Sequence, residues 1–151
     1  MISLDEYEFW FLTGSQDLYG EETLKQVAKN SKAMVDELNE RNVLPCKFVW
    51  KETLLTPQAI HKTLENANAD DKCAGVIIWC HTFSPAKMWI AGLNAYKKPL
   101  LQLNTQFNVE IPYATMDMDF MNLNQSAHGD REFGFITSRM DLPRKVIVGH
   151  W

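Results

Sequence analysis

The most constraining feature of this sequence is an apolar run near its middle in which polar and apolar residues do not alternate. The run reads Ala74-Gly75-Val76-Ile77-Ile78-Trp79-Cys80. A strand with one face in water alternates in polarity, whereas a continuous apolar run is typical of a strand covered by helices on both faces. Such strands belong almost entirely to parallel sheets. We therefore expect this run to form the central strand of a parallel sheet.

Strand-like and helix-like patterns alternate on both sides of this run. Further strands are predicted at residues 7–13, 46–50, 99–103 and 145–148. After the first of them, apolar residues from Leu24 to Leu38 recur at three- and four-residue steps, which is the period of a helix. The pattern therefore changes from strand to helix several times along the chain, as in α/β proteins.

Helix starts and breaks can also be predicted. Thr56-Pro57 and Ser84-Pro85 each offer an N-cap residue followed by a first-turn proline, so we expect a helix after each pair. The segment 117–140 is expected to hold one broken helix or two, interrupted near residues 125–129. These boundaries leave one helical segment between each pair of successive strands.

This order of elements predicts a parallel sheet with right-handed crossovers. We expect a three-layer αβα, flavodoxin-like doubly wound sheet of about five strands in the order 2-1-3-4-5. Residues 1–151 are expected to form a single domain. No helix follows the fifth strand to cover its second face, so we also expect the sequence to be part of a longer chain, or a domain covered by a partner.

Composition excludes several classes of function. The net charge of −4 and the lack of a basic stripe argue against a nucleic-acid partner. No apolar run reaches membrane-spanning length, and the N-terminus lacks the basic start and the cleavage site of a signal peptide. The three cysteines form no Cys-x-x-Cys pair and are odd in number, which favours a reducing compartment. We therefore expect a cytoplasmic protein with no membrane partner.

Ligands of such sheets bind beyond the carboxyl ends of the strands where the strand order reverses, which here selects residues 14–20 and 81–85. The first of these loops fits neither phosphate motif. Gln16 stands where a dinucleotide fingerprint needs its second glycine, and Glu21 follows Gly20 where a P-loop needs lysine. Carboxylates at a helix start also oppose a phosphate there. A small ligand of this loop is therefore expected to be neutral and polar.

The side chains of the two loops are typical of a sugar site but also ordinary for loops, and both interpretations stay open. The loops present Gln16, Tyr19, His81, Thr82 and Phe83. A third polar cluster is either a helix junction with local caps or a further ligand contact, and it comprises Asn122, Asn124, Gln125, Ser126 and His128. Neither a calcium loop, nor metal spacing among the histidines, nor a catalytic motif is recognisable.

Three long segments of the sequence resemble the N-terminal region of bacterial L-arabinose isomerases. They are residues 11–20 (FLTGSQDLYG), 79–89 (WCHTFSPAKMW) and 117–129 (DMDFMNLNQSAHG). The resemblance extends over the whole chain, through Val148-Gly149-His150-Trp151. Chains of this family are much longer, so the sequence resembles their N-terminal domain.

This resemblance implies a function, and it implies that substrate contacts and catalysis belong to different parts of the family chain. The family interconverts L-arabinose and L-ribulose, and often D-galactose and D-tagatose, by proton transfer between glutamates through an ene-diol. Its Mn²⁺ is held by glutamates and histidines in later parts of the family chain, so we assign no catalytic residue, no metal ligand and no cofactor to this chain alone. In the family's hexamer the active site lies between neighbouring subunits. The positions that match its substrate contacts are Gln16, Leu18, Tyr19, Phe83, Gln125 and His128.

Two functions are therefore expected to compete. The first is a substrate-contacting part of an aldose-ketose isomerase that is inactive alone. The alternative is an oligomerisation or binding module with a flavodoxin-like fold and no direct substrate role. A flavodoxin-like cofactor binder is disfavoured because the acidic end of the first loop opposes a phosphate.

Overall fold

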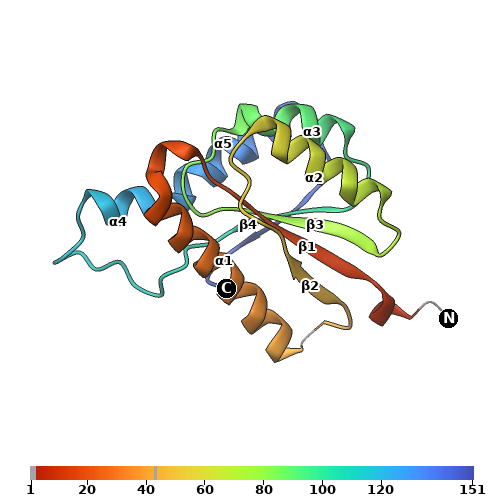
Figure 1. Ribbon diagram of the computed structural model, residues 1–151, viewed down its shortest axis with the longest axis horizontal. Helices are drawn as coiled ribbons and strands as arrows, with labels where there is room; N and C mark the ends of the chain where they lie inside the picture. The colour runs from red at the N-terminus through yellow and green to blue at the C-terminus, as the bar shows by residue number, and fades with distance from the viewer. Residues whose placement is uncertain (1–2, 43) are drawn as a thin grey trace.

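The computed structural model describes residues 3–42 and 44–151 and shows a five-stranded sheet with helices on both sides (Figure 1). The strands are β1 (Glu8–Gly14), β2 (Lys47–Trp50), β3 (Cys73–Cys80), β4 (Leu100–Asn104) and β5 (Lys145–Val148). All neighbouring strands are parallel, and their order is β2-β1-β3-β4-β5. The predicted three-layer flavodoxin-like fold and its strand order are therefore confirmed.

The helices lie close to their predicted positions. The α-helices are α1 (Gly20–Arg41), α2 (Pro57–Ala69), α3 (Ile90–Ala95), α4 (Met118–Leu123) and α5 (Ser126–Arg139). Short 3₁₀ turns are η1 (Leu4–Glu6), η2 (Asp17–Tyr19) and η3 (Ala86–Trp89). Among the described residues, no helix is both long enough and apolar enough to cross a membrane.

The central strand β3 is buried on both faces, as its apolar run predicts. Val76 and Ile78 pack into one core cluster with α2, α3 and α5, whereas Ile77 and Trp79 pack into a second cluster with α1. We call these two sides of the sheet the α2 face and the α1 face. Because consecutive side chains of a strand point to opposite faces, every position of β3 must be apolar to fill both clusters.

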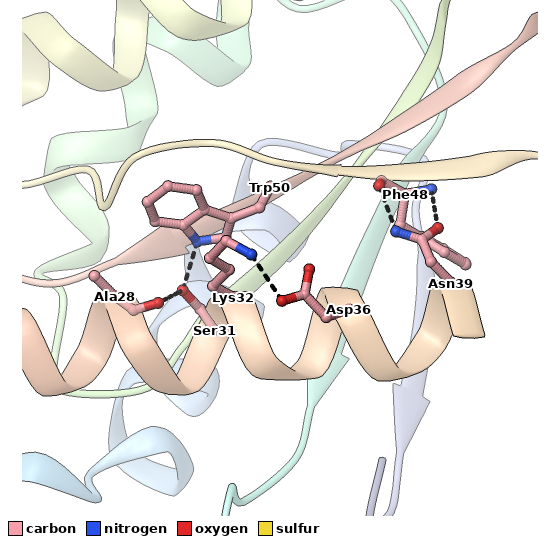
Figure 2. A network of polar contacts seen from close by, with 7 residues as sticks. All are labelled: Ala28, Ser31, Lys32, Asp36, Asn39, Phe48 and Trp50. Atoms are coloured by element: carbon pink, nitrogen blue, oxygen red, sulfur yellow. Dashed lines mark hydrogen bonds and ion pairs between the residues drawn. The ribbon is translucent and has the colours of Figure 1, made fainter. Parts of the chain in front are cut away.

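The edge strand β2 is fixed to α1 by side chains of that helix (Figure 2). The Asn39 amide donates to the Phe48 carbonyl at 2.9 Å and accepts from the Phe48 N–H at 2.9 Å. The Trp50 indole N–H donates to Ser31 Oγ at 2.7 Å. The amide of Asn39 thereby satisfies two backbone groups on the open side of β2, which blocks pairing with a further strand.

Thr56 caps α2 by accepting from the Ala59 N–H at 3.2 Å, as predicted. Two other details differ from the sequence-based expectations. Ser84 caps nothing, because its hydroxyl accepts the buried Trp89 indole N–H at 3.1 Å, and the prediction of a cap there is wrong. The break near residues 125–129 lies earlier than expected, between α4 and α5, so that Ser126 to Gly129 already form the first turn of α5.

The Asn39 contact generates a stability prediction. Asn39→Ala removes both bonds to Phe48, so we expect the free energy of unfolding, measured by urea titration, to fall by about 1–2 kcal/mol. The control is Asn66→Ala at an exposed position of α2, where no backbone partner is lost and the better helix propensity of alanine makes the change neutral or slightly stabilising. Equal effects of the two substitutions would contradict this role of Asn39.

Candidate functional site

The loops that follow β1 and β3 are held together at the carboxyl edge of the sheet. Ser15 Oγ and Thr82 Oγ1 lie 2.6 Å apart, and both residues are fully buried. The Gln16 side-chain amide donates to the Phe83 carbonyl at 3.2 Å. We call these two hydrogen bonds the loop clamp. Because the clamp joins residues far apart in the chain, it fixes the position of the first loop relative to the second.

Within the first loop, a turn exposes two of the predicted site residues. The 3₁₀ turn η2 is followed by Gly20, whose φ of 78° is left-handed and favours glycine before α1 begins. Leu18 on this turn is 84% exposed, whereas Tyr19 is half-buried. Glu21 in the first turn of α1 pairs with Lys25 at 2.6 Å on the surface. An acidic, exposed helix start of this kind remains unfavourable for a phosphate.

The second loop is mostly buried, which corrects one expectation. His81, Thr82 and Ser84 are each 0% exposed, so the expectation that His81 and Thr82 face a ligand is wrong in this conformation. Their hydrogen-bonding groups turn inward because the loop leaves a strand that is covered on both faces. Phe83 is half-buried and is the member of this set that reaches the surface.

His81 is a buried, neutral histidine. Its ring stacks on the Trp79 indole with ring centroids 4.5 Å apart, and its Nε2 lies 2.8 Å from the Asn30 amide nitrogen. Because the Asn30 amide N–H donates, Nε2 accepts and the proton lies on Nδ1. Asn30 is itself oriented by Gln26, whose amide donates to its oxygen at 2.6 Å. Burial lowers the pKa of His81 to about 4, so this imidazole stays uncharged at neutral pH.

The first turn of α5 brings a third segment to the loop clamp. The rings of Phe83 and His128 stack with centroids 4.4 Å apart, and His128 is exposed. Gly129 allows this approach, since a Cβ there would lie 2.8 Å from the Cys80 Cβ and 3.0 Å from the Thr82 carbonyl oxygen. The Gln125 carbonyl accepts the backbone N–H groups of His128 and Gly129 at the helix start.

The polar cluster around Gln125 is also a helix junction, as the local-cap interpretation predicts. Asp117 caps α4 by accepting from the Phe120 N–H at 2.8 Å. The Asn124 amide donates to the Phe120 carbonyl at 2.9 Å, and the Gln125 amide donates to the Asn122 side-chain oxygen at 3.2 Å. The same residues that end α4 and start α5 therefore position His128.

The structure brings three of the six predicted site residues into one chain of contacts, namely Gln16, Phe83 and His128. Gln125 lies one turn before His128, and Leu18 and Tyr19 lie on η2 after Gln16. Tyr19 lines one surface hollow with Phe120, whereas Gln125 lines a separate hollow of about 640 Å³ between the 104–116 loop, α4 and the end of β5. Gln16, Phe83 and His128 thus form an open surface instead of a closed cavity.

Two buried titratable groups lie directly behind this surface. Asp130 is 1% exposed, and neither of its carboxylate oxygens has a hydrogen-bond partner among the described residues. Burial raises the pKa of Asp130 to about 8, against a weaker opposing effect of the nearby Cys80 backbone N–H. Burial, followed by the Asp130 and Glu132 carboxylates, also raises the pKa of the Cys80 thiol. Cys80 is therefore not an activated nucleophile.

Asp130 was missed by the sequence analysis, although a signal was present. The buried positions of α5 are Ser126, Gly129, Asp130, Phe133 and Thr137. These positions follow the three- and four-residue steps of one helix stripe, so the spacing alone places Asp130 on the core side.

Metal-binding chemistry can be tested from the donor groups. Across residues 3–42 and 44–151, no group of three or more histidine, cysteine, aspartate or glutamate side chains is arranged to hold a metal ion. His61 pairs instead with Glu65 on α2 at 3.3 Å. No metal ligand is therefore assigned among the described residues.

The comparisons with known proteins agree with one another. Residues 3–151 match the family model for the L-arabinose isomerase N-terminal domain. The whole chain is 62% identical to an L-arabinose isomerase of Geobacillus kaustophilus, 63% to one of Thermotoga petrophila and 60% to one of Clostridium beijerinckii. It covers 30%, 30% and 31% of these proteins, respectively, and so spans less than a third of their length.

The buried groups predict how stability depends on pH. Between pH 4 and 6.5, lowering the pH destabilises the fold through His81, because only the unfolded state binds that proton. Over the same range, lowering the pH stabilises the fold through Asp130, which is protonated in the folded state. The two effects therefore oppose each other. Above pH 6.5 only the Asp130 effect remains. We expect the free energy of unfolding to fall by about 2 kcal/mol between pH 6.5 and 8.

Urea titrations at several pH values check this expectation. In Asp130→Asn the decrease between pH 6.5 and 8 should disappear, and below pH 6.5 the His81 effect should emerge as a loss of stability on acidification. Asp71→Asn, at an exposed aspartate, is the control and should keep the parent profile. An Asp130→Asn profile that still follows the parent would show that the Asp130 carboxyl is not protonated in the folded state.

The loop clamp predicts coupling between its two hydroxyls. Thr82→Val keeps the side-chain shape but leaves the buried Ser15 hydroxyl without a partner, so we expect a loss of about 1–3 kcal/mol in the free energy of unfolding. The double variant Ser15→Ala/Thr82→Val should lose less than the sum of the single changes, because no unpaired hydroxyl remains. Strictly additive losses would argue against the hydrogen bond.

Proposed function

The chain belongs to the L-arabinose isomerase family through its N-terminal domain, and on that premise we propose that it supplies substrate-contacting loops to the active site of an aldose-ketose isomerase. The reaction is the conversion of L-arabinose to L-ribulose, with D-galactose to D-tagatose as a second reaction of the same kind. The observation that carries the proposal is the contact chain Gln16–Phe83–His128, which joins three distant segments at one surface.

The chemistry of this surface suits a neutral sugar. Its amide, imidazole and phenol groups can hydrogen-bond to hydroxyls, and the face of Phe83 can pack against C–H groups. Because the Gln16 amide nitrogen donates to the Phe83 carbonyl, its amide oxygen is oriented to accept a hydrogen bond from a sugar hydroxyl. Stacking on Phe83 fixes the ring plane of His128, so the imidazole edge presents its nitrogens to the ligand.

We propose that a neighbouring subunit of a homo-oligomer completes the site. The surface is open, and Leu18 beside it is 84% exposed, which is costly for a leucine that nothing covers. A second chain laid over Leu18, Tyr19 and His128 would bury the leucine and enclose the sugar. In this proposal the oligomer is the hexamer expected for the family, and the active site lies between its subunits.

The metal ion expected for the family does not fit the described part of this chain, which offers no ligand cluster. In this proposal, metal binding and proton transfer belong to other parts of the full-length protein. The residues of this domain bind and orient the sugar and shield it from water. Its cysteines, Cys46, Cys73 and Cys80, are all free thiols, which fits a reducing, cytoplasmic setting.

A second candidate is an assembly module with no direct substrate role. The observation that favours it is the exposure of large apolar side chains on the 105–117 loop and α4, where Val109 is 82%, Tyr113 77% and Met118 64% exposed. Such a patch marks a protein interface more often than a sugar site. Both candidates predict oligomer contacts, so they differ only in what Gln16 and His128 do.

Substitutions in a full-length isomerase that contains this domain separate the candidates. We expect Gln16→Ala and His128→Ala each to lower kcat/KM for L-arabinose about tenfold or more, because each removes about 1–3 kcal/mol of substrate binding. The oligomer, measured by light scattering, should stay intact. His61→Ala, at a half-buried position of α2 outside the contact chain, is the control and should leave both quantities unchanged.

The alternative candidate predicts a different pattern. Loss of the oligomer in Gln16→Ala or His128→Ala would favour an assembly role. Full activity in both variants would exclude substrate contact by these residues.

A further inference from the structure

The α1 face of the sheet is only partly covered. The α1 helix lies over the β1–β2 side of that face, and beyond it the sheet is hollowed by an apolar groove of about 370 Å³. Side chains of all five strands line it, among them Phe9, Ile77, Leu101, Leu103 and Ile147. The groove runs towards β5, all four residues of which are exposed.

From β1 to β4 the two faces of the sheet are covered unequally, whereas β5 is exposed on both faces, with Val146 40% and Ile147 44% exposed. On the α2 face, α2, α3 and α5 pack against the strands and bury residues such as Leu100 and Phe133. On the α1 face, Ile147 is 44% exposed, although it lies beside Leu103 in the β4–β5 pairing. A parallel strand is normally covered on both faces, because its apolar side chains point both ways. The groove is therefore apolar sheet surface that no helix among the described residues covers.

The backbone after β5 leads onto this groove. Gly149 turns the chain with a φ of 142°, and its N–H donates to the Asn104 carbonyl at 3.2 Å. Trp151 then lies over the α1 face, because its N–H donates to Thr105 Oγ1 at 3.2 Å and its indole N–H donates to the Phe107 carbonyl at 3.1 Å. Its ring stacks on Phe107 with centroids 5.7 Å apart and lines the end of the groove.

We propose that this groove is the docking site of an amphipathic helix formed by the residues that follow position 151 in a chain of the relatives' length. Two observations support this occupant over a separate protein. The matched relatives extend well beyond the region that this chain covers, which is 30% of their length. Position 151 already lies at the groove, so a helix starting there needs only a short connection.

The chemistry of the occupant follows from the groove. Its floor is apolar from β1 to β5, so the helix must present an apolar stripe at three- and four-residue spacing. The opposite face of such a helix lies in water and is polar. About ten to fifteen residues are enough, since this is the usual length of a helix that packs on a sheet. The helix would lie beside α1 and complete the second helical layer.

The test compares the 151-residue chain with the full-length protein and with a chain extended by about 25 residues past position 151, which leaves room for the helix and its connection. In the extended chain, we expect a higher urea midpoint and at least a threefold lower fluorescence of bound anilinonaphthalene sulfonate, a dye that reports exposed apolar surface. The full-length protein should show equally low dye binding. Unchanged midpoint and dye binding in the extended chain would overturn the proposal.

A matched pair of variants in β5 identifies the face that is covered. Ile147 and Val146 are 44% and 40% exposed in this chain and point to opposite faces of the same strand. Ile147→Ser should lower the urea midpoint of the extended chain more than that of the 151-residue chain. Val146→Ser should lower both midpoints equally. An Ile147→Ser effect that is the same in both chains would overturn the proposal.

Light scattering distinguishes the other occupant, a second copy of this chain. The proposal predicts that Ile147→Ser leaves the oligomeric state of the 151-residue chain unchanged. If the 151-residue chain forms a dimer and Ile147→Ser dissociates it, the groove binds another copy and the proposal is wrong. None of these measurements depends on sugar turnover. The docking proposal can therefore fail while the proposed function stands, and the proposed function can fail while the docking proposal stands.

Discussion

The burial of β3 on both faces is the constraint on which the rest of the molecule depends. Because neither face of β3 meets water, the loop that leaves its carboxyl end starts inside the protein. The polar groups of that loop must then find partners within the fold. His81 Nε2 bonds Asn30, Thr82 bonds Ser15 and Ser84 bonds the Trp89 indole, whereas His81 Nδ1 has no partner among the described residues. Phe83 reaches the surface, and the buried neighbours Thr82 and Ser84 fix its position.

The electrostatic character of this edge follows from the same burial. Desolvation holds His81 neutral, Asp130 largely protonated and the Cys80 thiol protonated near neutral pH. The buried groups of this edge therefore add little charge, and its charged side chains, such as Asp17, Glu21 and Glu22, lie at the surface. The acidic start of α1 is unfavourable for a phosphate, and burial keeps the Cys80 thiol from being an activated nucleophile. A binding role for a neutral polyol is consistent with these properties, with proton transfer left to other parts of a longer chain.

The fold could be predicted from local patterns because each pattern reports one physical requirement. The apolar run 74–80 reports burial on two faces, and Thr56-Pro57 reports a helix start, and both predictions are confirmed. The prediction of a Ser84 cap failed because the Ser84 hydroxyl bonds the indole N–H of Trp89, five residues later, instead of a backbone N–H. Local sequence also could not show that His81 and Thr82 are buried, since that depends on Ser15 and Asn30, which are distant in the chain. The six site residues came from family resemblance, and their role in substrate binding stays a prediction.

In the function we propose, this domain binds and positions a sugar, and other parts of the full-length protein perform the chemistry. The most direct measurement is ketose formation by the purified 151-residue chain incubated with L-arabinose and Mn²⁺, with a full-length isomerase of the family as positive control. We expect no ketose above the level without protein, because no group of side chains among the described residues is arranged to hold a metal ion. Turnover by the 151-residue chain, abolished by a substitution within it, would place the proton transfer in this domain and contradict the proposal.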